Sequence, residues 1–158
     1  MNNLELRVVG VERLEEVFSL DQEYEFDRYS KQTLKDSLLN DNFINFVVYN
    51  ENDVPLGYVS YSIILDEAEL LKIVVSKKYR GYGVGLFLLN NSLNYINKDD
   101  VVKSVFLEVR KSNLSAINLY KKENFVKIYE RLKYYSDGED AEVYRLNFDE
   151  KNKLWIHW

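Results

Sequence analysis

The spacing of apolar residues along the chain predicts seven strands and four helices. Leu86, Leu89 and Leu93 recur at helical spacing, for example, and similar patterns predict helices over residues 11–24, 31–40, 86–96 and 112–125. Strand-like stretches cover residues 4–9, 42–50, 55–65, 68–76 and 102–110, and residues 126–148 contain two more. Strands followed by alternating helices and strands describe a mixed sheet with helices on its faces, which is an α/β (α+β) fold.

Local signals refine several of these elements. Residues 68–76, with the sequence AELLKIVVS, are nearly continuously apolar, so we expect a strand covered on both faces. Ser30 is well placed to cap the 31–40 helix, and Ser112 or Asn113 to cap the 112–125 helix. Asn124 stands near the end of that last helix, where a left-handed backbone is tolerated. The turn signal SDGED separates the last two strands.

Composition bounds the domain organisation and the partners. The chain has 158 residues, 46% of them hydrophobic, which is enough for one sizeable core. We therefore predict a single domain over residues 1–158. A formal net charge of −5 offers no broad positive surface, so we expect no direct nucleic-acid partner. The N-terminus has no basic stretch before an apolar run, and no apolar segment reaches membrane length, so we expect a cytoplasmic protein without a membrane partner.

The residue types limit the chemistry. The sequence has no cysteine, and its only histidine is His157. This argues against disulfides, cysteine-rich zinc sites, thiol nucleophiles and catalytic triads with a histidine base, and we expect no metal site. Any catalytic base must be a carboxylate, a tyrosine, a lysine or water.

Three of the six glycines lie at positions 81, 83 and 85, between a predicted strand and a predicted helix. A glycine inside a regular element costs roughly 0.5–1 kcal/mol relative to alanine, so this cluster needs a reason. A loop at a helix N-terminus presents free N–H groups and the positive end of the helix dipole, which suits a phosphate. A dinucleotide fingerprint would need glycine at position 86 or 88, where leucines stand, and the chain has no Gly-Lys pair for a P-loop.

Arg80, Gly83 and Gly85 instead fit the pattern (Q/R)-x-x-G-x-(G/A), and on these residues the chain resembles the GNAT superfamily of N-acetyltransferases. The resemblance implies a mostly antiparallel seven-stranded sheet, about four flanking helices, and a loop whose main-chain amides hold the pyrophosphate of acetyl-CoA. The alternative is a flexible surface loop with glycines for helix packing. The residues to which the resemblance gives a cofactor-binding role are Ile73, Val74, Val75, Arg80, Gly81, Tyr82, Gly83, Val84, Gly85, Asn113 and Tyr120.

The segments AELLKIVVSKKYRGYGVG, LEVRKSNLSAINLYKKENF and YYSDGEDA occur in the order and spacing of the RimI-like branch of that superfamily. Members of the branch acetylate the N-terminal alanine of a small-subunit ribosomal protein. The resemblance covers roughly residues 43–148. Two departures stand out: Asn124 replaces the usual glycine after the last helix, and Tyr29 stands where many relatives carry tryptophan. The resemblance implies direct transfer of an acetyl group to a peptide or protein N-terminal amine.

Glu108 and Tyr120 are the candidate catalytic residues. Alternation within SVFLEVR places Phe106, Glu108 and Arg110 on one face of the strand, where the phenylalanine would partly desolvate the carboxylate. The same pattern fits a solvent-facing Glu–Arg pair, and the spacing around Tyr120 fits a buried aromatic residue. The resemblance implies that Glu108 is the base, acting through water, and that Tyr120 is the acid beside the coenzyme sulfur.

Tyr29, Tyr134 and Tyr135 are the candidate acceptor-binding residues. Neutralising an α-amine at cytoplasmic pH costs about 0.7 kcal/mol, against about 4 kcal/mol for a lysine, so a protein N-terminus suits a weak base. The acidic balance also suits a small cationic amine such as a polyamine, an amino acid or a drug-like amine. A non-catalytic CoA-binding module is a third interpretation. The tail at residues 151–158 contains both tryptophans and should pack against its own domain or a second subunit, so a monomer and a homodimer both stay open.

Overall fold

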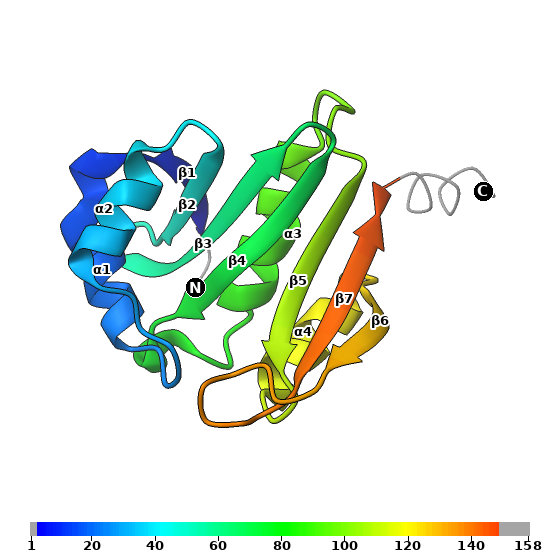
Figure 1. Ribbon diagram of the computed structural model, residues 1–158. Coiled ribbons are helices and arrows are strands. Elements are labelled where there is room, and N and C mark those ends of the chain that lie inside the picture. The colour runs from blue at the N-terminus through cyan, green and yellow to red at the C-terminus, as the bar shows by residue number, and fades with distance from the viewer. Residues whose placement is uncertain (1–2, 149–158) are drawn as a thin grey trace. The chain divides into compact units, whose positions relative to one another are not determined.

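The computed structural model describes residues 3–148, and the tryptophan-containing tail lies outside the described residues. Seven strands form a sheet in the order β1-β2-β3-β4-β5-β7-β6 (Figure 1). Strands β4 and β5 are parallel, whereas the pairs β1–β2, β2–β3, β5–β7 and β6–β7 are antiparallel. The predicted mixed, mostly antiparallel sheet is therefore confirmed. The strands are β1 (Glu5–Val9), β2 (Phe43–Tyr49), β3 (Pro55–Ile64), β4 (Glu67–Val75), β5 (Ser104–Arg110), β6 (Val126–Arg131) and β7 (Ala141–Asn147).

Within residues 3–148, four α-helices accompany the sheet, as the sequence predicts: α1 (Leu14–Gln22), α2 (Lys31–Leu39), α3 (Val84–Ile96) and α4 (Leu114–Lys122). Single 3-10 turns precede α1 at Val11–Arg13 and lead into the glycine stretch at Lys77–Tyr79. Helix α3 begins two residues earlier than expected, because its first turn takes in Gly85. The backbone of Asn124 is left-handed, with a φ of 64°, as predicted for the residue after α4.

Ser30 caps α2, and its replacement should destabilise the fold. The Ser30 hydroxyl accepts a hydrogen bond from the main-chain N–H of Thr33 at 3.0 Å. We expect Ser30→Ala to lower the free energy of unfolding by about 1 kcal/mol, measured by urea denaturation. The exposed Ser115, inside the first turn of α4, is the matched control, and Ser115→Ala should change stability by less than about 0.5 kcal/mol. Equal losses from the two substitutions would contradict the capping role.

The chain divides into two compact units, each made of two stretches. The described part of the first unit is residues 3–62 and 71–95, and that of the second is residues 63–70 and 96–148. The expectation of a single domain remains a prediction. In the first unit, α1 and α2 pack on one face of the strands through a cluster that includes Val17, Leu34 and Tyr58. Helix α3 lies on the other face of these strands (Figure 1). There the hydroxyls of Tyr61 and Ser92 are 2.7 Å apart.

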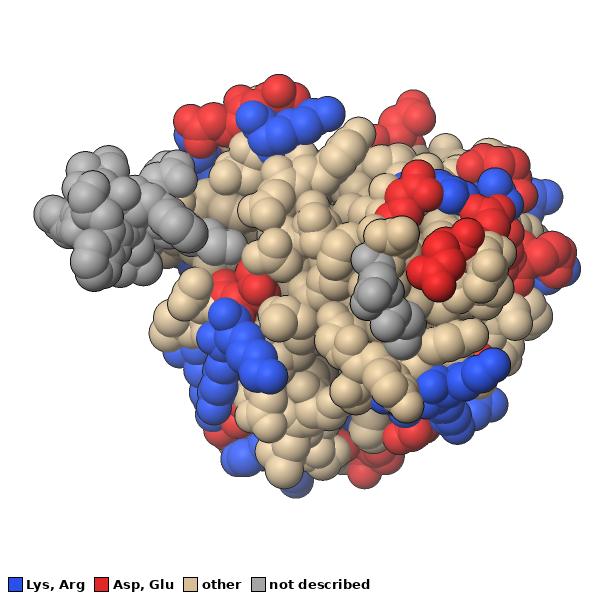
Figure 2. Space-filling model, turned by 180° about the vertical axis from the view of Figure 1, so that it is seen from behind, with Lys and Arg blue, Asp and Glu red and all other residues tan. Residues whose placement is uncertain are grey.

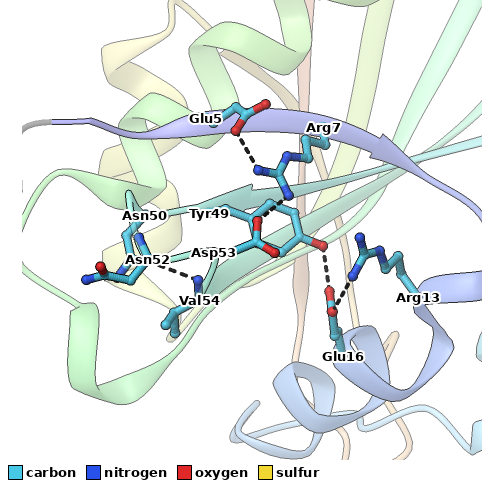
Figure 3. A network of polar contacts seen from close by, with 9 residues as sticks. All are labelled: Glu5, Arg7, Arg13, Glu16, Tyr49, Asn50, Asn52, Asp53 and Val54. Atoms are coloured by element: carbon cyan, nitrogen blue, oxygen red, sulfur yellow. Dashed lines mark hydrogen bonds and ion pairs between the residues drawn. The ribbon is translucent and has the colours of Figure 1, made fainter.

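A polar network joins α1 to the strands of the first unit (Figure 3). The ring of Tyr49 is fully buried, and its hydroxyl donates a hydrogen bond to Glu16 on α1 at 2.5 Å. Burial raises the pKa of Tyr49, and the Glu16 carboxylate raises it further, so the phenol stays a donor. The Arg7 guanidinium lies 4.4 Å from the centre of the Tyr49 ring and pairs with Asp53 at 2.5 Å. These contacts hold the first turn of α1 against β2, and β1 against the turn that follows β2.

In the second unit, β5 has one apolar, buried face formed by Val105, Leu107 and Val109. On β7, Leu146 lies opposite Val105 and is also buried. The buried face of α4 contributes Ile117 and Tyr120 to the core of this unit. The predicted alternation along SVFLEVR is therefore confirmed.

One expectation about local structure is wrong, and the turn between the last two strands is where the sequence placed it. Strand β4 is not covered on both faces: Leu70, Lys72 and Val74 are buried, whereas Ile73 and Val75 on the alternate face are half-exposed. Because successive strand residues point to opposite faces, only every second residue of this apolar run is buried. The link between β6 and β7 spans residues 132–140 and includes the predicted turn at SDGED, where the main-chain N–H of Gly138 donates to the Tyr135 carbonyl at 2.8 Å. Lys133, near the start of the link, binds the Asp140 carboxylate through its main-chain N–H.

Candidate active site

The glycine loop, residues 80–85, leads into α3 in the first unit. Gly81 and Gly83 have left-handed backbones, with φ angles of 80° and 81°, and no atom lies within 4 Å of where a Cβ would stand on either. The conformation favours glycine, and the space beside both residues is open. The first helical hydrogen bond runs from the Phe87 N–H to the Gly83 carbonyl at 3.0 Å, so the amides just before Phe87 have no partner within the helix. This geometry fits a bound phosphate group at the positive end of the α3 dipole.

Arg80 fastens the start of the loop. Its Nε donates to the Val75 carbonyl at 2.9 Å, and its guanidinium pairs with Glu25 at 2.9 Å. Glu23 adds a second tie, because its carboxylate accepts a hydrogen bond from the main-chain N–H of Lys77 at 2.6 Å. Glu23 and Glu25 follow α1, and nothing in their sequence spacing marks them as loop anchors. The structure thus gives Arg80 a role in shaping the glycine loop.

The remaining predicted cofactor-binding residues of the first unit lie on β4 and around the loop. Val74 is buried in the cluster under α1 and α2, while Ile73 and Val75 are half-exposed on the other face of β4. Tyr82 is 70% exposed, and Val84 is buried at the start of α3. Within the first unit, the main-chain amides of the loop and the half-exposed Ile73 and Val75 of β4 remain the predicted cofactor contacts.

Glu108 lies on the less buried face of β5 in the second unit. Its cross-strand neighbour on β7 is Val143, and Phe106 lies opposite Arg145 on the same face. The side chain of Glu108 is 20% exposed, so its carboxylate is partly shielded from water. Glu69 reaches the same face from the parallel strand β4, because it pairs with Phe106. The predicted placement of Phe106 and Glu108 on one face is confirmed.

Three side chains interact electrostatically with the Glu108 carboxylate. Arg131 on β6 forms an ion pair with it, with Nε 2.9 Å from a carboxylate oxygen. A hydrogen bond to Glu108 raises the pKa of Tyr134, so this phenol stays protonated beside the carboxylate. Partial burial raises the pKa of Glu69, and the Glu108 charge raises it further. The structure therefore unites two predicted site residues, Glu108 and Tyr134, with two that were not predicted, Glu69 and Arg131.

Tyr135 and Arg110 belong to a set of contacts that anchors the 132–140 loop. Arg110 is buried, stacks 3.9 Å from the centre of the Tyr135 ring, and pairs with Asp137 at 2.8 Å and Glu139 at 2.9 Å. Glu139 in turn accepts a hydrogen bond from the main-chain N–H of Ser112 at 2.8 Å. These contacts tie the 132–140 loop to the end of β5 and the start of α4. They hold the loop that carries Tyr134 beside Glu108.

The two predicted site residues on α4 differ in burial. Asn113 caps the helix, since its side-chain oxygen accepts a hydrogen bond from the main-chain N–H of Ala116 at 3.3 Å. Tyr120 is 5% exposed, and its ring centre lies 5.7 Å from that of Phe125. In the first unit, Tyr29 is half-buried at the end of the segment that joins α1 to α2.

In Figure 2, Lys and Arg lie beside Asp and Glu in groups around the edge of the face shown, and other residues fill its centre. Within residues 3–148, no three His, Asp or Glu side chains are grouped so that they could hold a metal ion. No helix in this part of the chain has the length and apolar character needed to cross a membrane.

The mixed seven-stranded sheet, in which β4 leads through the glycine loop into α3, is similar to the fold of an N-acetyltransferase of known structure. The acetyltransferase (GNAT) family model matches residues 11–125, and the chain belongs to that family.

Individual proteins give the same result. The chain is 27% identical to a putative ribosomal protein bS18-alanine N-acetyltransferase of Bacillus subtilis, over 92% of this chain and 96% of that protein. It superposes on the crystal structure of the ribosomal-protein-S18-alanine N-acetyltransferase from Escherichia coli with a TM-score of 0.84 and 27% identity, covering 92% and 94% of the two chains. It is also 41% identical to an N-alpha-acetyltransferase of Sulfolobus acidocaldarius over 78 residues, which span 49% of this chain and only 46% of that relative.

Proposed function

We propose that this protein transfers the acetyl group of acetyl-CoA to the α-amine at a peptide or protein N-terminus. The observation that carries the proposal is the glycine loop: Gly81 and Gly83 hold left-handed backbones with open space beside them, at the start of α3 and inside the stretch that matches the family. The printed activities of the Bacillus and Escherichia relatives support an N-terminal acceptor. The proposed setting is the cytoplasm, where acetyl-CoA and newly made N-termini are both present.

Acetyl-CoA supplies a thioester whose carbonyl carbon is open to attack by an amine. In the proposed reaction, the loop amides bind the pyrophosphate, and main-chain groups of Ile73–Val75 orient the pantetheine arm. Glu108 accepts one proton of the acceptor ammonium through water, and the neutral amine forms the new C–N bond as the C–S bond breaks. The nitrogen loses a second proton on becoming an amide, and this proton converts the departing thiolate to the thiol. Tyr120 donates a hydrogen bond to the departing thiolate. The acetyl group passes directly to the amine without an acyl-enzyme.

The unit that contains Glu108 suits a cationic acceptor. Glu108 and Glu69 share one face of the sheet, and the Tyr134 hydroxyl is bonded to Glu108. An α-ammonium group docked against this face would find carboxylates to attract it and a base to deprotonate it. Because an α-amine has a pKa near 7.7–8.0, a weak base is sufficient.

Mass spectrometry of peptide products tests this function. Purified protein and acetyl-CoA are incubated with a peptide that begins with alanine and contains one internal lysine. The same peptide with a blocked N-terminus and free spermidine serve as matched acceptors. We expect one acetyl group on the α-amine and none on the blocked peptide. Acetylation of spermidine or lysine alone would assign the small-amine or side-chain alternative. Binding of acetyl-CoA without any transfer would indicate a non-catalytic module.

Removal of the Tyr120 hydroxyl should slow turnover without disturbing the fold. In Tyr120→Phe the ring still packs against Phe125, so stability should fall by no more than about 1 kcal/mol. We expect kcat to fall about 10²-fold, the lower range for a general acid. Tyr144 is the matched control, because it is equally buried and its hydroxyl bonds Glu142 at 2.6 Å. A Tyr120→Phe variant as active as Tyr144→Phe would remove Tyr120 from the mechanism.

A further inference from the structure

A buried lysine stands under the segment that joins α1 to α2. Lys72 on β4 is 6% exposed, although its neighbours on that face, Leu70 and Val74, are apolar. Its ammonium pairs with the fully buried Asp21 of α1 at 2.8 Å. Burial lowers the pKa of Lys72, and the Asp21 carboxylate opposes that shift. A buried ion pair seldom stabilises a fold more than apolar residues of similar size would. The role of the Lys72–Asp21 pair is therefore to be found in the parts of the chain that it holds in place.

The partners of the pair converge on residues 23–30, the linker between the two helices. Lys72 Nζ also donates to the main-chain carbonyl of Asp27, and it lies 3.8 Å from the centre of the Tyr29 ring and 4.7 Å from that of Tyr24. Stacking of an ammonium group on aromatic faces is attractive, most of all where water is excluded. The cation therefore contacts the linker near its start, at its middle and at its end.

Asp21 holds the same linker from the other side. Its Oδ2 accepts a hydrogen bond from the main-chain N–H of Tyr29 at 2.7 Å. Its Oδ1 accepts from both Lys72 and the hydroxyl of Tyr58, the latter at 2.5 Å. Both oxygens of the carboxylate thus accept hydrogen bonds, and the three donors come from the linker, from β3 and from β4. Tyr29, a predicted acceptor-binding residue, is held through its amide and its ring by this one ion pair.

We propose that Lys72 is a positioning residue for the acetyl acceptor: with Asp21 it holds the 23–30 linker so that Tyr29 has one fixed place before the acceptor binds. This inference rests on the proposed function and deepens it. Lys72 directly precedes Ile73–Val75, so a single strand would orient the cofactor through its main chain and the acceptor-binding linker through one side chain. Without the cation, the linker has to be ordered by the acceptor itself, and this weakens acceptor binding rather than slowing the chemical step.

Two variants separate positioning from stability. Lys72→Met removes the ammonium but leaves the Asp21 charge buried and unpaired, which threatens the fold. The double variant Lys72→Met with Asp21→Asn removes both charges, and the oxygen of the introduced amide can still accept the Tyr29 N–H. The Asp27 carbonyl and the Tyr29 ring nevertheless lose their cation in both variants. Lys31→Met is the matched control, because the Lys31 ammonium pairs with Glu15 of α1 and lies 5.8 Å from the Phe18 ring.

The first measurement is steady-state kinetics with the N-terminal alanine peptide. We expect the acceptor KM to rise about tenfold in the double variant, as when two or three side chains must be ordered on binding, with kcat within about twofold of wild type. The Kd for acetyl-CoA and all constants of Lys31→Met should remain unchanged. An unchanged acceptor KM in a folded double variant, or a loss of kcat alone, would overturn the proposal.

The second measurement is amide hydrogen exchange, which needs no activity. We expect exchange at residues 24–29 to quicken by about tenfold or more in the double variant, while amides of Ile73–Val75 keep their protection. Unchanged exchange at Tyr29 would show that Lys72 does not hold the linker, and would overturn the proposal whatever the kinetics. If wild-type protein acetylates no peptide, the proposed function fails, and the acceptor role of Lys72 fails with it; faster exchange would then assign Lys72 only an anchoring role.

Discussion

Glu108→Gln should lower kcat/KM for the N-terminal peptide by about 10²–10⁴-fold, the range supplied by a positioned general base. Glutamine keeps the shape of the side chain, and its amide oxygen can still accept the hydrogen bond of Tyr134, so the fold around β5 should persist although the ion pair with Arg131 is lost. Its neutral amide cannot take a proton. The Kd for acetyl-CoA should stay within about twofold of the wild-type value, because the glycine loop is proposed to bind the cofactor whereas Glu108 is proposed to accept a proton from the acceptor.

Glu130→Gln is the matched control for this prediction. Glu130 neighbours Arg131 on β6 and therefore faces the opposite side of the sheet, where it pairs with Lys127 at 2.5 Å. Its replacement removes a similar charge from the same region and should leave kcat/KM unchanged. If Glu108→Gln is as active as Glu130→Gln, the base is another group or water alone, and the assignment of Glu108 is wrong.

Gly83→Ala should weaken acetyl-CoA binding by about tenfold or more, which corresponds to at least about 1.4 kcal/mol. Alanine in a left-handed backbone is strained, and its methyl group would enter the open space in which a phosphate oxygen is proposed to approach. Isothermal titration of the folded variant with acetyl-CoA measures the effect directly. Any loss of stability is followed separately by urea denaturation.

Gly138→Ala separates backbone strain from cofactor binding. Gly138 has a φ of 87° and equally open surroundings, but it lies in the loop between β6 and β7. The two substitutions should cost similar stability, whereas only Gly83→Ala should weaken acetyl-CoA binding. Equal affinities in the two variants would show that the left-handed glycine before α3 serves the backbone alone.

The sequence predicted those features that depend on local spacing. Alternation along β5 placed Glu108 correctly, because a strand turns successive side chains to opposite faces whatever lies around it. The caps at Ser30 and Asn113 were equally predictable, since each depends on a hydrogen bond only three residues away. The glycine loop was found by its position between a strand and a helix.

The features that were not predicted depend on register and on distant pairing. Arg131 reaches Glu108 only because β6 pairs with β7 and β7 with β5, a strand order that spacing along the chain does not reveal. Glu69 joins the same face through the parallel register of β4 and β5. Lys72 sits in a nearly continuous apolar run, and its partner Asp21 lies 51 residues away on α1. The partners of these three residues depend on how the strands pair and where α1 packs, so the sequence alone did not indicate them.

Backbone amide NMR of the isotope-labelled protein tests most directly whether the glycine loop binds the pyrophosphate. Dephospho-coenzyme A, which keeps the pyrophosphate, and pantetheine, which lacks it, are titrated in parallel. We predict that dephospho-coenzyme A shifts the amide resonances of residues 81–86 and that pantetheine leaves them in place. Saturation with dephospho-coenzyme A without any shift at these amides, or the same shifts with both compounds, would contradict the account.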